Sequence, residues 1–196
     1  MELDEAATQI SEIHTQMLKS EVFRGYRTWP MLTTGVLALV AALLQTGLVG
    51  VCDPGQHAAY WVVIALACAT VAFGDLAFVF WREESRGQRE RILKAVGQIL
   101  PGLAAGAAVT VALLDTPAAD LLPGLWMILF ALCIFGSRLF LPRAVGVVAL
   151  FYLCAGTILL LDPSGAVSPF SMGLPFACGQ LGLAVVLHRN LARVGG

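Results

Sequence analysis

Six apolar stretches divide the 196-residue chain, and they limit its fold more than any other feature of the sequence. Each is about as long as the roughly 20 residues that a helix needs to cross the hydrocarbon core of a bilayer. Charged residues make up 13% of the chain, about half of the roughly 25% found in soluble domains. The sequence therefore predicts an all-α membrane protein with six transmembrane helices and no second globular domain. The stretches cover residues 30–50, 59–81, 97–114, 121–141, 144–161 and 169–188.

The basic residues all fall on one side of this arrangement. All twelve Lys and Arg residues precede the first stretch, follow the sixth, or lie in the second–third connection or at the fourth–fifth turn. The positive-inside rule then predicts a multi-pass membrane protein with both termini in the cytoplasm. The net charge is −1 and the bases are spread along one membrane face, so we expect no nucleic-acid partner. The other three connections hold only acidic residues, namely Asp53, Asp115, Asp120 and Asp162.

Short connections on the acidic side predict three antiparallel helix hairpins packed side by side. Each connection contains proline beside an acidic or small polar residue, a composition typical of tight turns. The sequence thus divides into a cytoplasmic arm (1–29), a six-helix transmembrane domain (30–188) and a cytoplasmic tail (189–196). The arm carries an apolar stripe at helical spacing, which predicts an amphipathic helix. That helix is the natural contact for a cytoplasmic protein partner or a second copy of the chain.

The four tryptophans fit this topology as an aromatic belt. Trp29 and Trp81 fall at the predicted inner ends of stretches, and Trp61 and Trp126 fall near the outer ends. Tryptophan is enriched at both membrane–water interfaces, where its ring meets the headgroups.

Asp75 is the acidic residue that the sequence places inside the membrane, six residues before Trp81. A carboxylate at a helix centre costs on the order of 2.5–3.5 kcal/mol on insertion scales, so something must compensate it. One interpretation is a pair with Arg138 that holds the second and fourth helices together. The other is that Asp75 lines a ligand or ion cavity or carries a proton. Arg138 by itself is typical of an ordinary residue at an inner turn.

Two amides are further candidates for a ligand or ion path. Gln45 lies in the outer part of the first helix and Gln180 near the middle of the sixth. Both can instead hydrogen-bond a neighbouring helix, which we expect to be the commoner role. Pro175 enters the sixth stretch five residues before Gln180 and predicts a helix break there. Gly102 and Gly106 form a small-residue packing face that serves contacts within one subunit or between two.

The residues needed for metal or nucleophile chemistry are scattered. His14 and His188 are predicted to be cytoplasmic and His57 external, and no Cys-x-x-Cys pair or His-Glu-x-x-His motif is present. The five cysteines are typical of small apolar packing residues. We therefore expect no cofactor, no metal site and no enzymatic activity.

One resemblance covers most of the chain. The segment Ser20–Arg27, the six apolar stretches and the closing Gly179-Gln180 and Asn190-Leu191 pairs together resemble uncharacterised bacterial six-helix membrane proteins of about 200 residues. The resemblance implies a bacterial inner membrane as the location, and it implies no activity.

Two functions remain open on the sequence alone. The first is a non-enzymatic membrane protein that binds a lipid or small ligand, or acts as an accessory or regulatory partner. The second is a small transporter or channel, as a homo-oligomer, with Asp75 on the path.

Overall fold

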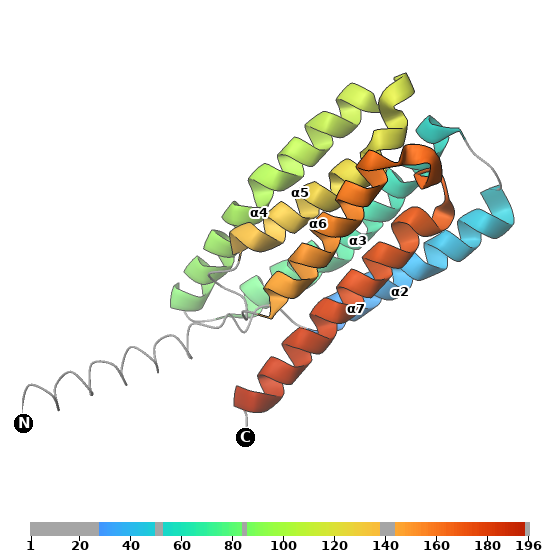
Figure 1. Cartoon of the computed structure of the whole chain (residues 1–196). Coiled ribbons are helices and arrows are strands. Elements are labelled where there is room, and N and C mark those ends of the chain that lie inside the picture. The colour runs from blue at the N-terminus through green and yellow to red at the C-terminus, as the bar shows by residue number, and fades with distance from the viewer. Residues whose placement is uncertain (1–27, 50–52, 84–85, 138–143, 195–196) are drawn as a thin grey trace, which may run out of the picture.

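The computed structural model describes residues 28–49, 53–83, 86–137 and 144–194, and every regular element in these ranges is a helix. The predicted all-α fold is therefore confirmed for the described residues. Figure 1 shows long helices that run up and down the molecule, connected by short turns at the ends. The long helices are α2 (Thr28–Leu44), α3 (Pro54–Arg82), α4 (Arg86–Leu113), α5 (Leu122–Gly136), α6 (Val145–Leu161) and α7 (Pro169–Val194). The short ones are η1 (Gln45–Val49), η2 (Pro117–Leu121) and η4 (Pro163–Gly165).

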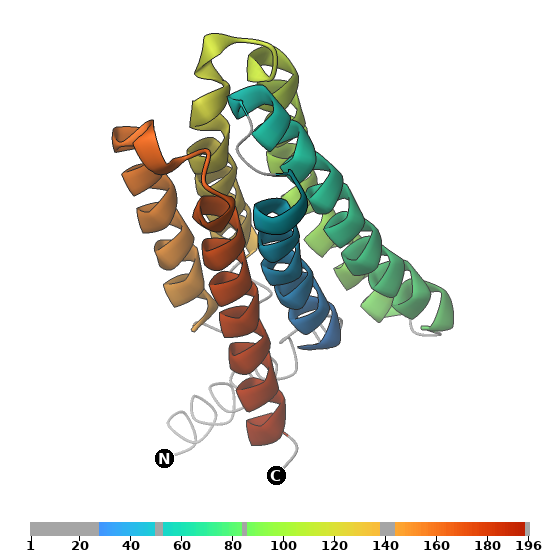
Figure 2. The same cartoon turned by 90° about the vertical axis from the view of Figure 1, so that its right-hand side faces the viewer.

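The lengths and compositions of these helices are compatible with a multi-pass membrane protein. Within the described residues, five helices are long and apolar enough to cross a membrane. The remaining long helix, α6, is apolar but only 17 residues long. Helix α2 begins and helix α7 ends at the same end of the bundle, which we call the terminal end (Figures 1 and 2).

Asp53 and Asp162, at the opposite end, form two of the three predicted turns by capping the helices that follow. The Asp53 side chain accepts a hydrogen bond from the backbone N–H of Gln56 at 2.9 Å, and Pro54 starts α3. Asp162 accepts from the Ser164 N–H at 3.2 Å and from the Ser164 hydroxyl at 2.6 Å. These two bonds hold the pKa of the exposed Asp162 carboxyl below its usual value. A capping carboxylate accepts hydrogen bonds from the free N–H groups of the first helical turn, and a proline at the first helical position has no N–H that needs a partner. These turns therefore follow directly from the sequence.

The most extensive contact in the molecule joins the first and last long helices, α2 and α7. Figure 2 shows them antiparallel and side by side. Small residues on both faces let the two backbones approach closely. A Cβ at Gly35 would lie 3.1 Å from the Cβ of Gln180, and a Cβ at Gly173 would collide with the Cβ of Ala42. In a bilayer, where lipid tails are as apolar as the side chains, such close packing is a main source of helix association.

Glycines also set the approach of α5 to its two neighbours. A Cβ at Gly124 would lie 2.9 Å from the Gly156 carbonyl oxygen of α6, so these two backbones meet at this pair. On the other side of α5, a Cβ at Gly102 of α4 would collide with the Cys133 sulfur. The Gly102–Gly106 face of α4 therefore packs within the chain, against α5.

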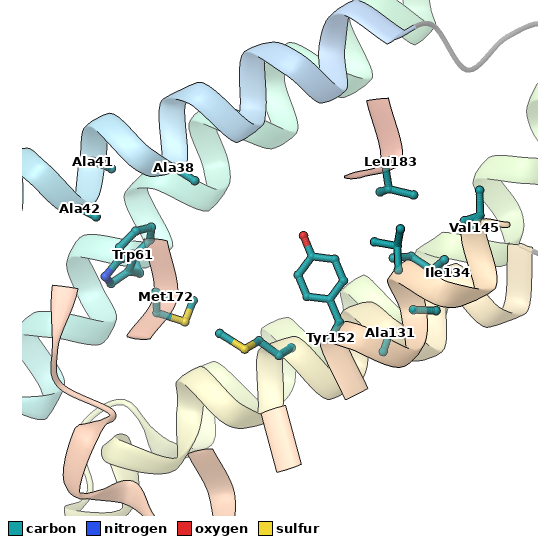
Figure 3. Packing of buried hydrophobic residues seen from close by; sticks show 13 residues of the cluster. Ala38, Ala41, Ala42, Trp61, Ala131, Ile134, Val145, Tyr152, Met172 and Leu183 are labelled. Carbon is teal, nitrogen blue, oxygen red and sulfur yellow. The ribbon is translucent and has the colours of Figure 1, made fainter. Parts of the chain in front are cut away.

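Tyr152 of α6 fills the centre of the core and is fully buried. Its ring makes an edge contact with Phe130, with centroids 5.1 Å apart, and its hydroxyl donates to the Phe176 carbonyl oxygen at 3.3 Å. Figure 3 shows the ring pointing into the space among Met172, Leu183 and other apolar side chains. A Cβ at Gly179 would collide with this ring, so α7 is also close-packed here.

Helices α3 and α4 lie at the edge of the bundle. The most apolar 18-residue window of each contains no buried residue, whereas 39% to 44% of the windows in α2, α5 and α7 are buried. Beyond its first turns α3 diverges from α2 toward the terminal end (Figure 2). The predicted hairpin partners do contact one another, but α2–α7 and α5–α6 pack more extensively than any hairpin pair.

The break predicted at Pro175 is wrong, because α7 continues through it as one helix from Pro169 to Val194. Prolines are tolerated in membrane helices where neighbouring groups satisfy the freed backbone. The amphipathic arm and Arg138 lie outside the described residues.

The close approach of α2 and α7 predicts that Gly173→Ala destabilises the protein. The added methyl group would collide with Ala42, and overpacking of this kind costs about 1–3 kcal/mol. Gly74→Ala is the matched control, because a Cβ there meets nothing within 4 Å and alanine favours a helix. Thermal unfolding in detergent would measure both. Equal midpoints for the two variants would contradict the proposed packing.

Candidate functional site

Gln45 joins α2 to α3 through a buried polar cluster, the Gln45 cluster, made of Gln45, His57 and Trp61. Gln45 begins the π-helical turn η1, and turns of this kind are frequent at functional sites. Its amide nitrogen lies 2.8 Å from His57 Nδ1, and its amide oxygen accepts from Trp61 Nε1 at 3.0 Å. All three side chains are at most 3% exposed.

The bonding fixes the hydrogen positions in the Gln45 cluster. The indole N–H of Trp61 can only donate, so the group of Gln45 that faces it must be the amide oxygen. The amide nitrogen of Gln45 therefore donates to His57 Nδ1, which must be the unprotonated nitrogen of a neutral ring. The hydrogen of His57 lies on Nε2, which is buried and has no hydrogen-bond partner in the described structure.

The Gln45 cluster ties α3 to the core at the end opposite the terminal end. Tyr60 adds a bond by donating its hydroxyl to the Ala41 carbonyl oxygen at 2.7 Å. Gln45 thus bonds a neighbouring helix, the commoner of the two roles expected for it. Trp61 lies near the start of α3, at the end predicted for it, but it is buried, so its ring does not meet the headgroups as an aromatic belt requires. His57 was missed as a cluster member, although it lies four residues before Trp61 on the same helix face.

Gln180 lies elsewhere, on the α7 face that meets α2. It is 8% exposed, and its side-chain oxygen has no hydrogen-bond partner among the described residues. Gly35, which faces it, lies ten residues before Gln45 on the same chain segment. That separation is about 15 Å along a helix, so Gln180 and the Gln45 cluster are separate polar groups in the bundle.

Asp75 is half-buried on the divergent part of α3. It lies 18 residues after His57, about 27 Å along the helix at 1.5 Å per residue. The structure therefore does not bring Asp75 together with Gln45. The predicted pair with Arg138 stays a prediction, because Arg138 is not among the described residues.

An apolar groove runs between α3 and α4 near the terminal end, with a volume of about 290 Å³. We call it the α3–α4 groove. Its walls are entirely hydrophobic, and several of them are open to the surroundings: Leu93 is 60% exposed and Phe73 is 37% exposed. The lining residues are Phe73, Leu76, Ala77 and Phe80 of α3 and Ile92, Leu93 and Val96 of α4.

The guanidinium of Arg89 lies beside the end of the α3–α4 groove. The guanidinium carbon of Arg89 lies 5.4 Å from the centroid of the Phe80 ring, which lines the groove. Arg89 Nε donates to the Glu83 carbonyl oxygen at 2.7 Å, and this bond joins the start of α4 to the end of α3. Guanidinium over an aromatic face is a favourable arrangement. The positive charge of Arg89 is therefore held beside the apolar α3–α4 groove.

A larger hollow of about 540 Å³ lies at the other end of the molecule, between the start of α3 and the turn after α4. Asp53 and Asp115 line it. The Asp53 carboxylate already caps α3, so its place in this hollow is explained by turn formation. Within the described ranges, no three His, Cys, Asp or Glu side chains gather closely enough to hold a metal ion.

Comparison with known proteins adds no assignment. None of the family models, curated sequences or solved structures compared with this chain matches it.

The Gln45 cluster predicts that Gln45→Leu destabilises the protein by about 2–6 kcal/mol. The change leaves His57 Nδ1 and the Trp61 N–H buried without partners, and each such group costs about 1–3 kcal/mol. Thr46→Val is the control, because Thr46 is exposed and bonds only its own helix at the Ala42 carbonyl. We expect that change to stay within about 0.5 kcal/mol. Unfolding in detergent measures both, and a stable Gln45→Leu protein would show that the cluster is not needed.

Proposed function

We propose that this chain is a non-enzymatic membrane protein that binds a lipid in the α3–α4 groove. The single observation that carries the proposal is the α3–α4 groove itself, which is lined only by apolar side chains and lies on the exposed side of the bundle formed by α3 and α4. In this proposal all six long helices cross a bacterial inner membrane. The terminal end of the bundle faces the cytoplasm.

The charges at the two ends of the helices support that orientation. Arg82 ends α3, Arg86 begins α4 and Arg189 lies in the last turns of α7, so basic residues gather at the terminal end. Asp53 and Asp162 lie in turns at the other end. Basic residues favour the cytoplasmic side of a membrane, and acidic ones have little influence. The groove then lies near the cytoplasmic leaflet.

The chemistry of the groove matches a hydrocarbon chain. Its seven lining side chains offer apolar surface only, and burial of such surface against an acyl chain needs no hydrogen-bonding partner. The membrane windows of α3 and α4 contain no buried residue, so a lipid can enter sideways from the bilayer. No domain has to open first. The groove is therefore accessible to the one apolar ligand that surrounds a membrane protein at high concentration.

Transport through Asp75 has less support. A path would need polar groups that are free to meet an ion or substrate. The Gln45 amide is used by His57 and Trp61, and Asp75 is about 27 Å from His57 along α3. A homo-oligomer and a cytoplasmic partner of the arm (1–29) remain expectations beside the lipid-binding function.

Filling the groove is the direct test of lipid binding. Ala77 lines the groove and is exposed, so Ala77→Phe should occupy the space of the acyl chain without disturbing the core. We expect native mass spectrometry of the detergent-purified protein to show a lipid retained by the wild type. The retained fraction should fall about tenfold in the variant, the equivalent of about 1.4 kcal/mol.

The control is Ala67→Phe, an exposed alanine of the same helix that does not line the groove. Both variants add the same ring to the surface of α3. If they retain lipid equally well, lipid is held by the general apolar surface and the proposed function is wrong.

A further inference from the structure

We infer that the α3–α4 groove is selective for anionic phospholipids, with Arg89 as the residue that binds the lipid phosphate. The inference rests on the proposed function and names the class of lipid that the groove holds. It follows from the position of the Arg89 guanidinium beside the end of the α3–α4 groove.

The first step is that Arg89 is held in place. Its Nε atom donates to the Glu83 carbonyl oxygen at 2.7 Å, and its guanidinium lies over the Phe80 ring. The side chain is half-buried, and these two contacts come from the neighbouring helix α3. An ordered guanidinium loses less conformational entropy on binding than a free surface arginine does.

The second step is that Phe80 both lines the groove and contacts the guanidinium of Arg89. Phe80 lines the groove with one part of its ring surface and meets the guanidinium of Arg89 with another. A phospholipid has the same layout, with a charged phosphate next to apolar chains. A lipid whose chain lies along Phe73 and Phe80 therefore brings its phosphate to the level of Arg89. Because Nε is used by Glu83, the two terminal nitrogens would bind phosphate, a geometry that favours bidentate contact.

The third step is the charge of the surroundings. Residues 82–94 contain five basic and three acidic side chains, so the segment is net positive by two charges. Besides Arg89, the bases of this segment are Arg82, Arg86, Arg91 and Lys94, and its acids are Glu83, Glu84 and Glu90. A net positive segment favours a lipid that carries a full negative charge over one whose phosphate is neutralised by its own cation.

The test compares two lipids with identical acyl chains and different headgroups. Delipidated protein in detergent is titrated with phosphatidylglycerol or phosphatidylcholine, and bound lipid is counted by native mass spectrometry. We expect the wild type to bind phosphatidylglycerol at least about fivefold more tightly. Arg89→Gln should reduce that ratio to about one while the protein still binds both lipids, because the groove is intact.

The matched control is Arg86→Gln, which removes the same charge from an exposed arginine of the same helix. This variant should keep most of the wild-type preference, because it lowers the charge of the segment by one but leaves Arg89 in place. If Arg86→Gln and Arg89→Gln lower the preference equally, the selectivity comes from the overall charge of the segment and the inference is overturned. A wild type without headgroup preference overturns it too.

Two further measurements separate this inference from the proposed function and from misfolding. If Ala77→Phe removes binding of both lipids but the wild type prefers neither, lipid binding stands and only the role of Arg89 fails. If Ala77→Phe changes nothing, the proposed function itself fails. Arg89→Lys keeps the charge and should retain part of the preference; if it behaves like Arg89→Gln despite normal thermal unfolding, the contribution of the charge is refuted.

Discussion

The close contact between α2 and α7 is the constraint on which the rest of the structure depends. Gly35 and Ala42 on one helix face Gln180 and Gly173 on the other, at separations that leave no space for larger side chains. This contact joins the first and last described helices, so it closes the core around Tyr152. It also fixes both of these helix ends at the terminal end. Helices α5 and α6 supply much of that core, and the middle parts of α3 and α4 lie outside it.

The groove follows from that arrangement. With the core formed mainly by α2, α5, α6 and α7, the middle parts of α3 and α4 have few buried positions left to occupy. In water such apolar flanks would drive further packing, but in a bilayer lipid tails solvate them at little cost. Helix α3 is tied to the core at its start by the Gln45 cluster and is free to diverge beyond it. An open apolar groove on this bundle is thus compatible with the proposed membrane setting.

The sequence predicts the helices and their turns well because both depend on local chemistry. Asp53 and Pro54 are residue types favoured at a helix start whatever packs around them, and the apolar stretches need only hydropathy to be recognised. Helix order around the bundle depends instead on which small residues meet, so the α2–α7 contact could not be predicted. Trp61 looked like an interfacial residue for the same reason, since its burial depends on Gln45. In the Gln45 cluster, Gln45 was predicted as a polar residue of interest, but its bond to His57 was not. The α3–α4 groove and the role of Arg89 beside it depend on helix packing and could be identified only from the structure.

The most direct test of the account is a structure of the protein in a lipid nanodisc that contains phosphatidylglycerol, determined by electron cryo-microscopy with a bound antibody fragment. The account predicts continuous tubular density between α3 and α4, along Phe73 and Phe80, that ends in a headgroup beside Arg89. A groove closed by direct contact between α3 and α4, with no density inside it, would contradict the account.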